Sequence, residues 1–155
     1  TMSTNIAVMK LGVVQQLDTP DRVYHFPANL FVADFIGNPK VNLLEGVVQG
    51  KNSVKVADFS LSTEIHQAQG EIVVAVRPED IEVTTEPNPG AVEFTAYSVL
   101  PAGADSTIVA QRGETEITVK VMGISKIRMD QKIWLKFDPS SLNLYDKVSG
   151  NLVTA

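Results

Sequence analysis

The sequence predicts a mainly β protein: a small barrel or sandwich that follows a short β-hairpin and two short helices. Two observations carry this prediction. Beyond Pro39 the chain consists of short runs rich in Val, Ile, Thr and aromatic residues, separated by Gly, Asn, Pro or acidic residues. The helical spacing of apolar residues also ends there. With 155 residues and 44% apolar content, the chain is long enough for one ordinary domain with a real core.

The first part of the chain is predicted to form two strands and then two helices. The runs "NIAVM" and "GVVQQL" are joined by "KLG", which favours a hairpin turn. Thr19 or Asp18 can cap a helix, and Pro20 suits its first position. We expect a second helix, "ANLFVADFI", to start after Pro27. Its apolar side chains Leu30, Phe31 and Phe35 are predicted to share a buried face.

The second part of the chain is a series of strand-like runs. Closing them into a barrel would remove the exposed edges that many short strands create. The runs are "VNLLEGVVQG", "SVKVADFSLS", "EIVVAVRP", "IEV", "AVEFTAYSVL", "STIVAQRG", "TEITVKVMG" and "KIWLKFD".

Composition excludes several classes of protein. The net charge is −5, which argues against a broad nucleic-acid or membrane footprint, because such footprints need clustered Lys and Arg. The absence of cysteine excludes disulfides, thiol catalysis and thiolate metal sites. No apolar run approaches the roughly 20 residues that span a bilayer. The opening "TMSTNIAVMK" lacks the pattern of a signal peptide.

The stretch "RPEDIEV" permits two interpretations. Arg77, Pro78, Glu79 and Asp80 place an arginine beside two acids, as in a catalytic carboxylate cluster. A catalytic pair, however, needs one desolvated and one solvated acid. Pro78 ends a central strand because it cannot donate to the ladder. We therefore interpret residues 77 to 80 as a structural turn.

Other catalytic and metal-binding patterns are missing. His25 and His66 are the only histidines, and neither has a partner at metal-ligand spacing. No phosphate-binding glycine loop and no nucleophile-elbow motif occurs. The sequence therefore predicts no catalytic, cofactor-binding or metal-binding residue in this chain.

The run "KIWLKF" is the best candidate for nucleic-acid binding. On a strand, Lys132, Trp134 and Lys136 would share one face, while Ile133 and Leu135 fill the core. Small barrels bind single strands with such aromatic and basic side chains. Because the chain is acidic and holds one tryptophan, we favour Trp134 as a packing or interface residue.

Several motifs together resemble a known family. The stretch from "IAVM" through "TPDRVYHFPANLFVADFIGNP" to Asn42 is similar to the end of the nucleotide-binding domain of maltose-type carbohydrate-importer ABC ATPases. "VRPEDI", Gly103 within "LPAGADSTIV" and the closing "FDPSSLNLYDKVSG" resemble the regulatory domain of that family. Where the family more often has Leu-Gly-x-Glu, this chain has "PAGAD", with Asp105 in the place of the acid.

The resemblance implies a fold, a division of the chain and a set of partners. Residues 1–38 would be the C-terminal remnant of the nucleotide-binding domain, and residues 39–155 an OB-fold-like β-barrel of the TOBE or MOP type. ATP and Mg²⁺ would bind an upstream domain, so this chain would need no cofactor and would not be an enzyme. Its expected partners are a second copy in a homodimer, the transporter membrane subunits and a regulatory protein. Its expected location is the cytoplasmic face of the membrane.

The resemblance also favours a homodimer interface near the C-terminal strand. The stretch "LNLYDKVSGNLV" holds Leu142, Leu144 and Tyr145, an apolar group close to the end of the chain. We take Tyr145 first and Trp134 second as interface anchors, because aromatic residues commonly dominate interfaces. The alternative is that both rings close the barrel core.

The sequence leaves two other functions open. The barrel could bind a small ligand, either an oxyanion or a sugar, as related barrels do. It could instead be an OB-fold module for single-stranded nucleic acid, with Trp134 as its stacking residue. Our principal interpretation remains the regulatory and dimerisation domain of an importer ATPase for sugars or glycerol phosphate.

Overall fold

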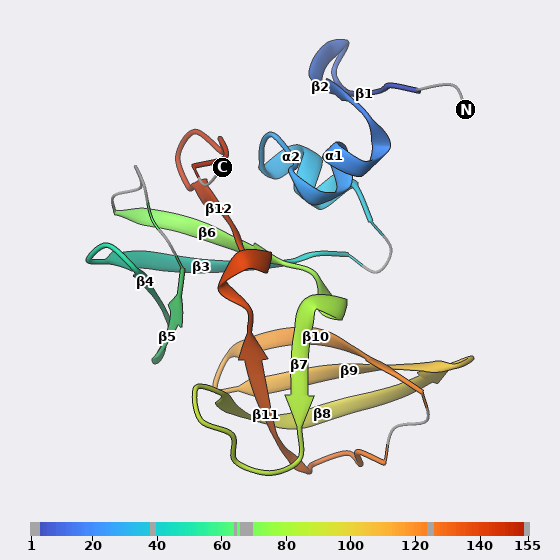
Figure 1. The fold of residues 1–155 in the computed structure, drawn as a ribbon, viewed down its shortest axis with the longest axis vertical. Helices are drawn as coiled ribbons and strands as arrows, with labels where there is room; N and C mark the ends of the chain where they lie inside the picture. The colour runs from blue at the N-terminus through green and yellow to red at the C-terminus, as the bar shows by residue number, and fades with distance from the viewer. Residues whose placement is uncertain (1–3, 38–39, 64, 66–69, 124–125, 154–155) are drawn as a thin grey trace. The chain divides into compact units, whose positions relative to one another are not determined.

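The structure, a computed structural model, describes residues 4–37, 40–63, 65, 70–123 and 126–153. Its contacts divide the chain into two compact units. Unit 1 contains the residues up to 75 together with those from 142 on, and unit 2 contains residues 76–141. Strands form most of both units (Figure 1), which confirms the predicted mainly β class. Neither described helix is long and apolar enough to cross a membrane.

Unit 1 combines a hairpin, two helices and a five-stranded sheet in the order β12-β6-β3-β4-β5. The last strand of the chain, β12, pairs antiparallel with β6 and so belongs to the sheet of the early strands. The elements are β1 (Ile6–Lys10), β2 (Val13–Asp18), α1 (Pro20–His25), α2 (Leu30–Phe35), β3 (Asn42–Gln49), β4 (Ser53–Val56), β5 (Phe59–Ser62), β6 (Glu71–Val76) and β12 (Asn143–Asp146).

Unit 2 is a five-stranded antiparallel sheet in the order β10-β9-β8-β11-β7. Strand β10, at one end of this order, also contacts β7 at the other end, so the sheet curls toward closure as a barrel does. The elements are the 3-10 turn η1 (Pro78–Asp80), β7 (Ile81–Thr84), β8 (Val92–Ala102), β9 (Asp105–Arg112), β10 (Thr115–Met122), β11 (Lys132–Phe137) and the 3-10 turn η2 (Pro139–Ser141).

The expected hairpin and first helix form where the sequence predicts them. Leu11 and Gly12 both have positive φ, 49° and 80°, as the tightest two-residue hairpin turn requires. At the start of α1, the Thr19 side chain accepts a hydrogen bond from the Arg22 amide at 3.3 Å, and Pro20 occupies the first helical position. Thr19 is therefore the cap, while Asp18 accepts from the Thr19 amide instead.

The second helix differs from its prediction in its first residue and in the face that it buries. It begins at Leu30 rather than directly after Pro27, because Asn29 caps it by accepting from the Val32 amide at 3.0 Å. The buried residues are Val32 and Ala33, whereas Phe35 is 65% exposed and only stacks on Phe31. The expectation that Leu30, Phe31 and Phe35 share a buried face was therefore wrong for Phe35.

Helix α2 packs into two separate clusters of unit 1. Val32 joins Val8 of β1 and Val23 of α1, so the hairpin and both helices share one core. Ala33, the next residue, joins Ala75 of β6 and Tyr145 of β12 in a second core. Adjacent residues on a short helix point in directions about 100° apart, which lets a single turn contact both clusters. Helix α2 thus links the hairpin to the sheet.

The run "SVKVADFSLS" forms two strands rather than one. Residues Ala57 and Asp58 turn the chain between β4 and β5, and Ala57 adopts a positive φ of 51°. Left-handed backbone is uncommon for a residue with a Cβ. Asp58 is a residue that turns favour, but the turn lacks the glycine or asparagine that most often supplies a positive φ, so it is only weakly marked in the sequence.

Candidate functional site

The C-terminal strand lies inside unit 1. Leu144 and Tyr145 are fully buried, and Leu142 is 5% exposed. Consecutive strand residues point to opposite faces, so the burial of both Leu144 and Tyr145 means that β12 is covered on both sides. The Tyr145 hydroxyl donates a hydrogen bond to the Pro27 carbonyl oxygen at 2.8 Å. This burial favours the alternative in which Tyr145 closes the core, and its role in an interface stays a prediction.

Trp134 lies on the outer side of the unit 2 sheet. Its strand neighbours Ile133 and Leu135 are fully buried, while Trp134 is half-buried, which is the predicted alternation. The adjacent Lys132 pairs with Glu93 of β8, with 3.2 Å between Nζ and Oε1. Of the four proposed interface residues, Trp134 is the one whose side chain reaches the surface of its unit.

Residues 77 to 80 form a tight connection between β6 and β7. The Asp80 amide donates to the Arg77 carbonyl oxygen at 3.0 Å, closing the 3-10 turn η1. Pro78 and Arg77 are buried, whereas Glu79 and Asp80 are exposed. Both acids are therefore solvated, as in a surface turn, and the interpretation of residues 77 to 80 as a structural turn stays a prediction.

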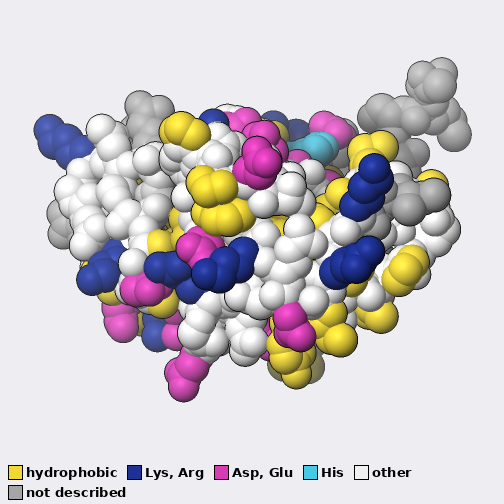
Figure 2. Space-filling model, turned by 90° about the horizontal axis from the view of Figure 1, so that it is seen from below, with side chains coloured by type: hydrophobic (Ala, Val, Ile, Leu, Met, Phe, Trp, Pro, Cys, Tyr) yellow, Lys and Arg dark blue, Asp and Glu magenta, His cyan; other side chains and the backbone are white. Residues whose placement is uncertain are grey.

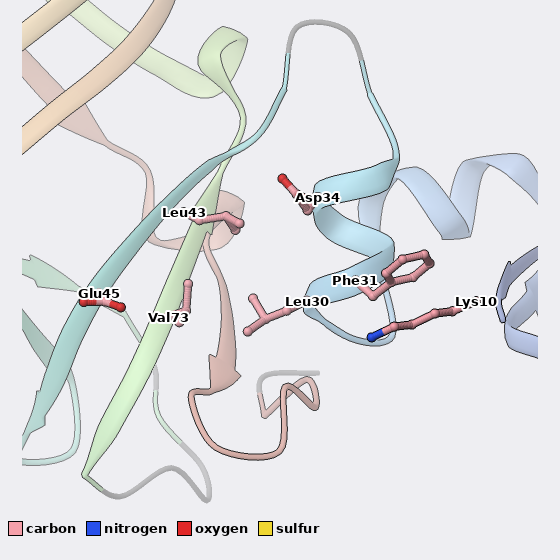
Figure 3. Close-up of a pocket in the computed structure, with 7 residues that line it drawn as sticks. All are labelled: Lys10, Leu30, Phe31, Asp34, Leu43, Glu45 and Val73. Atoms are coloured by element: carbon pink, nitrogen blue, oxygen red, sulfur yellow. The ribbon is translucent and has the colours of Figure 1, made fainter. Parts of the chain in front are cut away.

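A shallow pocket of about 480 Å³ opens between α2 and strands β3 and β6 of unit 1 (Figure 3). Leu30, Leu43 and Val73 give it an apolar floor. Its charged lining residues come from separate elements, so no local motif could have revealed the pocket. They are Lys10, Asp34 and Glu45, and the seventh lining residue is Phe31.

The charged groups around this pocket already have partners. The Lys10 Nζ lies 5.3 Å from the centroid of the Phe31 ring, a cation–π distance. Glu45 pairs with Lys147 at 3.4 Å, and Asp34 lies 4.0 Å from the ammonium of Lys40. Because both acids are paired with lysines and the described lining holds one amine, the pocket offers no cluster of cations for an anion.

The described residues contain no group of three His, Asp or Glu side chains placed to hold a metal ion. His25 lies on α1 beside Asp21, at 3.4 Å. His66 falls outside the described residues, as does the predicted boundary between residues 38 and 39, which stays a prediction.

The turn after β12 is organised by Asp146. Its Oδ1 accepts hydrogen bonds from the backbone amides of Ser149 at 2.8 Å and Val148 at 2.9 Å. The Ser149 amide is the main reason that the pKa of Asp146 lies below its ordinary value, since these bonds favour the charged carboxylate. The pKa of Asp138 is lowered in the same way by Ser140, and that of Asp18 by the Thr19 amide.

These lowered pKa values predict a loss of stability in acid. A carboxyl whose pKa is lower in the folded chain stabilises the fold fully above its unfolded pKa of about 4, and loses that contribution as the pH falls further. Asp146→Asn should therefore lower the thermal midpoint at neutral pH, and the difference from wild type should shrink below about pH 4. Glu114→Gln, which makes the same charge change at an exposed turn of unit 2, is the control. A constant difference across this pH range would show that the carboxylate charge is not responsible.

No protein-family model matches the chain, but curated proteins match it along almost its whole length. An uncharacterised ABC transporter ATP-binding protein, YcjV of Escherichia coli O6:H1, is 30% identical over 94% of this chain. The trehalose/maltose import ATP-binding protein MalK of Thermococcus litoralis is 29% identical over 99%. The sn-glycerol-3-phosphate import ATP-binding protein UgpC of E. coli O1:K1 is also 29% identical over 99%. The chain spans less than half the length of these relatives, 42% to 45%.

Among solved structures, the cytoplasmic molybdate-binding protein ModG resembles this chain with a TM-score of 0.56. The match covers 66% of this chain and 94% of ModG at 16% sequence identity, so it speaks for the fold alone. It confirms the predicted OB-like barrel. The sequence matches confirm the resemblance on which the family assignment rests. Over 94% to 99% of its length the chain is thus similar to the C-terminal part of ATP-binding proteins of maltose-type ABC importers.

Proposed function

We propose that the chain is the regulatory and dimerisation part of an importer ATP-binding protein for a sugar or for a glycerol-phosphate-type substrate. The observation that carries this proposal is the match of 94% to 99% of the chain to YcjV, MalK and UgpC. ATP and Mg²⁺ then bind the larger part of such proteins, which the match does not include, and this chain performs no hydrolysis. Its partners are a second copy, the transporter membrane subunits at the cytoplasmic face and a regulatory protein.

The hairpin supports the assignment of residues 1–38 to the end of a nucleotide-binding domain. Strands β1 and β2 form a two-stranded sheet that pairs with no other described strand. Leu11, Val13 and Leu17 are 95%, 61% and 65% exposed. A lone two-stranded hairpin is marginally stable in water, and apolar side chains at its free edges favour further pairing. We therefore propose that this hairpin completes a sheet of the adjoining domain.

Self-association tests the dimerisation part of this proposal. We expect light scattering to give twice the chain mass at high protein concentration and a falling mass on dilution, because association depends on concentration. Lys132→Glu, a charge reversal beside Trp134, should shift this equilibrium toward the monomer if the outer face of β11 is the contact. A strict monomer mass at every concentration would contradict the proposed dimer.

Binding of a small ligand is the second candidate function, and the pocket of unit 1 supports it. ModG is a molybdate-binding protein, which makes an oxyanion one candidate ligand. Among the described residues, the pocket lining holds no cluster of cations, so we propose a neutral sugar as the other candidate. Calorimetric titrations with molybdate, sulfate, glycerol phosphate and maltose separate these classes. Heat with maltose that is lost in Leu43→Lys would support the pocket, and four flat titrations would remove this candidate.

The surface favours these functions over nucleic-acid binding. On the face of the described residues in Figure 2, Lys and Arg side chains lie among Asp and Glu side chains instead of forming one basic area. Together with the net charge of −5, this interspersed pattern lacks the clustered cations that phosphate backbones need.

A further inference from the structure

We propose that residues 26–29, which connect α1 to α2, couple the hairpin β1–β2 to the C-terminal strand β12, so that loosening one side loosens the other. This connection, called here the 26–29 linker, consists of Phe26, Pro27, Ala28 and Asn29. The proposal concerns unit 1 alone and holds whether or not the chain acts in an importer.

On the hairpin side, one side chain of β2 holds two backbone groups of the linker. The Gln16 Nε2 donates to the Phe26 carbonyl oxygen at 3.2 Å, and its Oε1 accepts from the Ala28 amide at 2.9 Å. The neighbouring Gln15 accepts from the Asn29 side-chain amide at 2.9 Å. The linker is thus bound to β2 at three points.

On the opposite side, the C-terminal part of the chain binds the carbonyl oxygens of Pro27 and Ala28. The Tyr145 hydroxyl donates to the Pro27 carbonyl oxygen at 2.8 Å, and the Leu152 amide donates to the Ala28 carbonyl oxygen at 3.2 Å. The Gly150 carbonyl oxygen accepts from the Leu30 amide at 2.9 Å, just past the linker. Two distant parts of the sequence therefore share one short stretch of backbone.

The linker cannot move toward one side without breaking bonds on the other. Proline has no amide hydrogen, so the Pro27 backbone offers only a carbonyl oxygen, and the buried Tyr145 hydroxyl binds it. Ala28 donates its amide to the hairpin side and receives at its carbonyl from the C-terminal side. The bond between Tyr145 and Pro27 is buried, and a buried polar group that loses its partner costs more free energy than the bond contributes, so release of the linker on the C-terminal side is unfavourable. The bonds of both sides should consequently form and open together.

Asn29 extends this coupling into helix α2. Its side-chain amide donates to Gln15, while the Oδ1 of the same side chain caps α2 through the Val32 amide. Ala33, one residue further, packs against Tyr145 in the second core. A shift of the hairpin would therefore reach β12 both through the linker backbone and through the first turn of α2.

Amide hydrogen exchange of the whole chain tests the coupling with a cycle of two variants. Tyr145→Phe removes the hydroxyl and keeps the buried ring, and Gln16→Ala removes both hydrogen bonds from β2. We expect Tyr145→Phe to raise exchange of the β1–β2 ladder amides by roughly three- to tenfold, the scale of one neutral hydrogen bond. In the Gln16→Ala background this increase should be clearly smaller, because only the bond between Gln15 and Asn29 then joins β2 to the linker. Tyr97→Phe and Gln111→Ala make the same chemical changes in unit 2 and serve as controls.

Amide exchange measured in β12 tests the same coupling in the reverse direction. Since coupling between two sites is reciprocal, Gln16→Ala should accelerate exchange of the Leu144 and Asp146 amides more in the wild-type background than in Tyr145→Phe, where only the backbone bonds of Gly150 and Leu152 still join the C-terminal part to α2 and the linker. If the hairpin amides of Gln16→Ala exchange too fast to follow, the exchange of the β12 amides tests the coupling instead. Equal fold-changes of the hairpin in both backgrounds, or an effect of Tyr145→Phe confined to β12, would overturn the proposal.

Discussion

Tyr145→Ala is expected to lower the free energy of unfolding of unit 1 by about 3–5 kcal/mol, the cost of truncating a fully buried aromatic side chain. The ring packs between Ala33 of α2 and Ala75 of β6, and these small neighbours cannot fill the space that it would leave. The Pro27 carbonyl oxygen would also lose its hydroxyl donor. Urea denaturation followed by far-ultraviolet circular dichroism measures the change.

Two variants separate the possible reasons for this loss. Tyr145→Phe keeps the ring and should cost only about 1–3 kcal/mol, the penalty of a buried acceptor without a partner. Tyr97→Ala truncates a tyrosine that is 56% exposed, so its effect should stay within about 0.5 kcal/mol. Unchanged stability of Tyr145→Ala, accompanied by loss of the dimer mass, would instead assign Tyr145 to an interface between copies.

Gly46→Ala should destabilise unit 1 by about 1–3 kcal/mol through overpacking between β3 and β4. A Cβ at position 46 would lie 2.8 Å from Cγ1 of Val54 and 2.9 Å from the backbone oxygen of Lys55. Val54 is fully buried and the Lys55 oxygen belongs to the backbone, so neither atom can move aside without displacing the strand. The same urea denaturation measures the loss.

The neighbouring Val47 provides the control for this glycine. Val47 is 50% exposed on the other face of β3, and Val47→Ala removes methyl groups without placing any atom against β4. Its effect should therefore be much smaller than that of Gly46→Ala. Because alanine suits a strand interior better than glycine, an effect of Gly46→Ala no larger than that of Val47→Ala would mean that the contact with Val54 is relieved at little cost.

The parts of the fold that depend on local chemistry were predictable from the sequence. The cap at Thr19, the tight turn at Leu11 and Gly12, and the alternation around Trp134 all follow from neighbours within a few residues. Each of these features is determined by backbone geometry or by the period of two along a strand. The mainly β class follows for the same reason.

The parts that depend on contacts between distant segments were not predictable. Phe35 has the spacing of a buried helical residue, yet the clusters that cover α2 contact Val32 and Ala33 instead. The pairing of β12 with β6 joins residues about 70 positions apart, and it decides that Tyr145 is inside. The pocket likewise draws on four separate elements. No local pattern encodes such pairings.

The emission of Trp134 tests the proposed self-association most directly, because Trp134 is the single tryptophan and lies half-buried on the outer face of unit 2. Its spectrum is recorded while the protein is diluted over a wide concentration range. The account predicts a shift toward the blue at high concentration, with the same midpoint as the doubling of mass, since the ring leaves water when two copies meet. An emission spectrum and a mass that both stay constant over this range would contradict it.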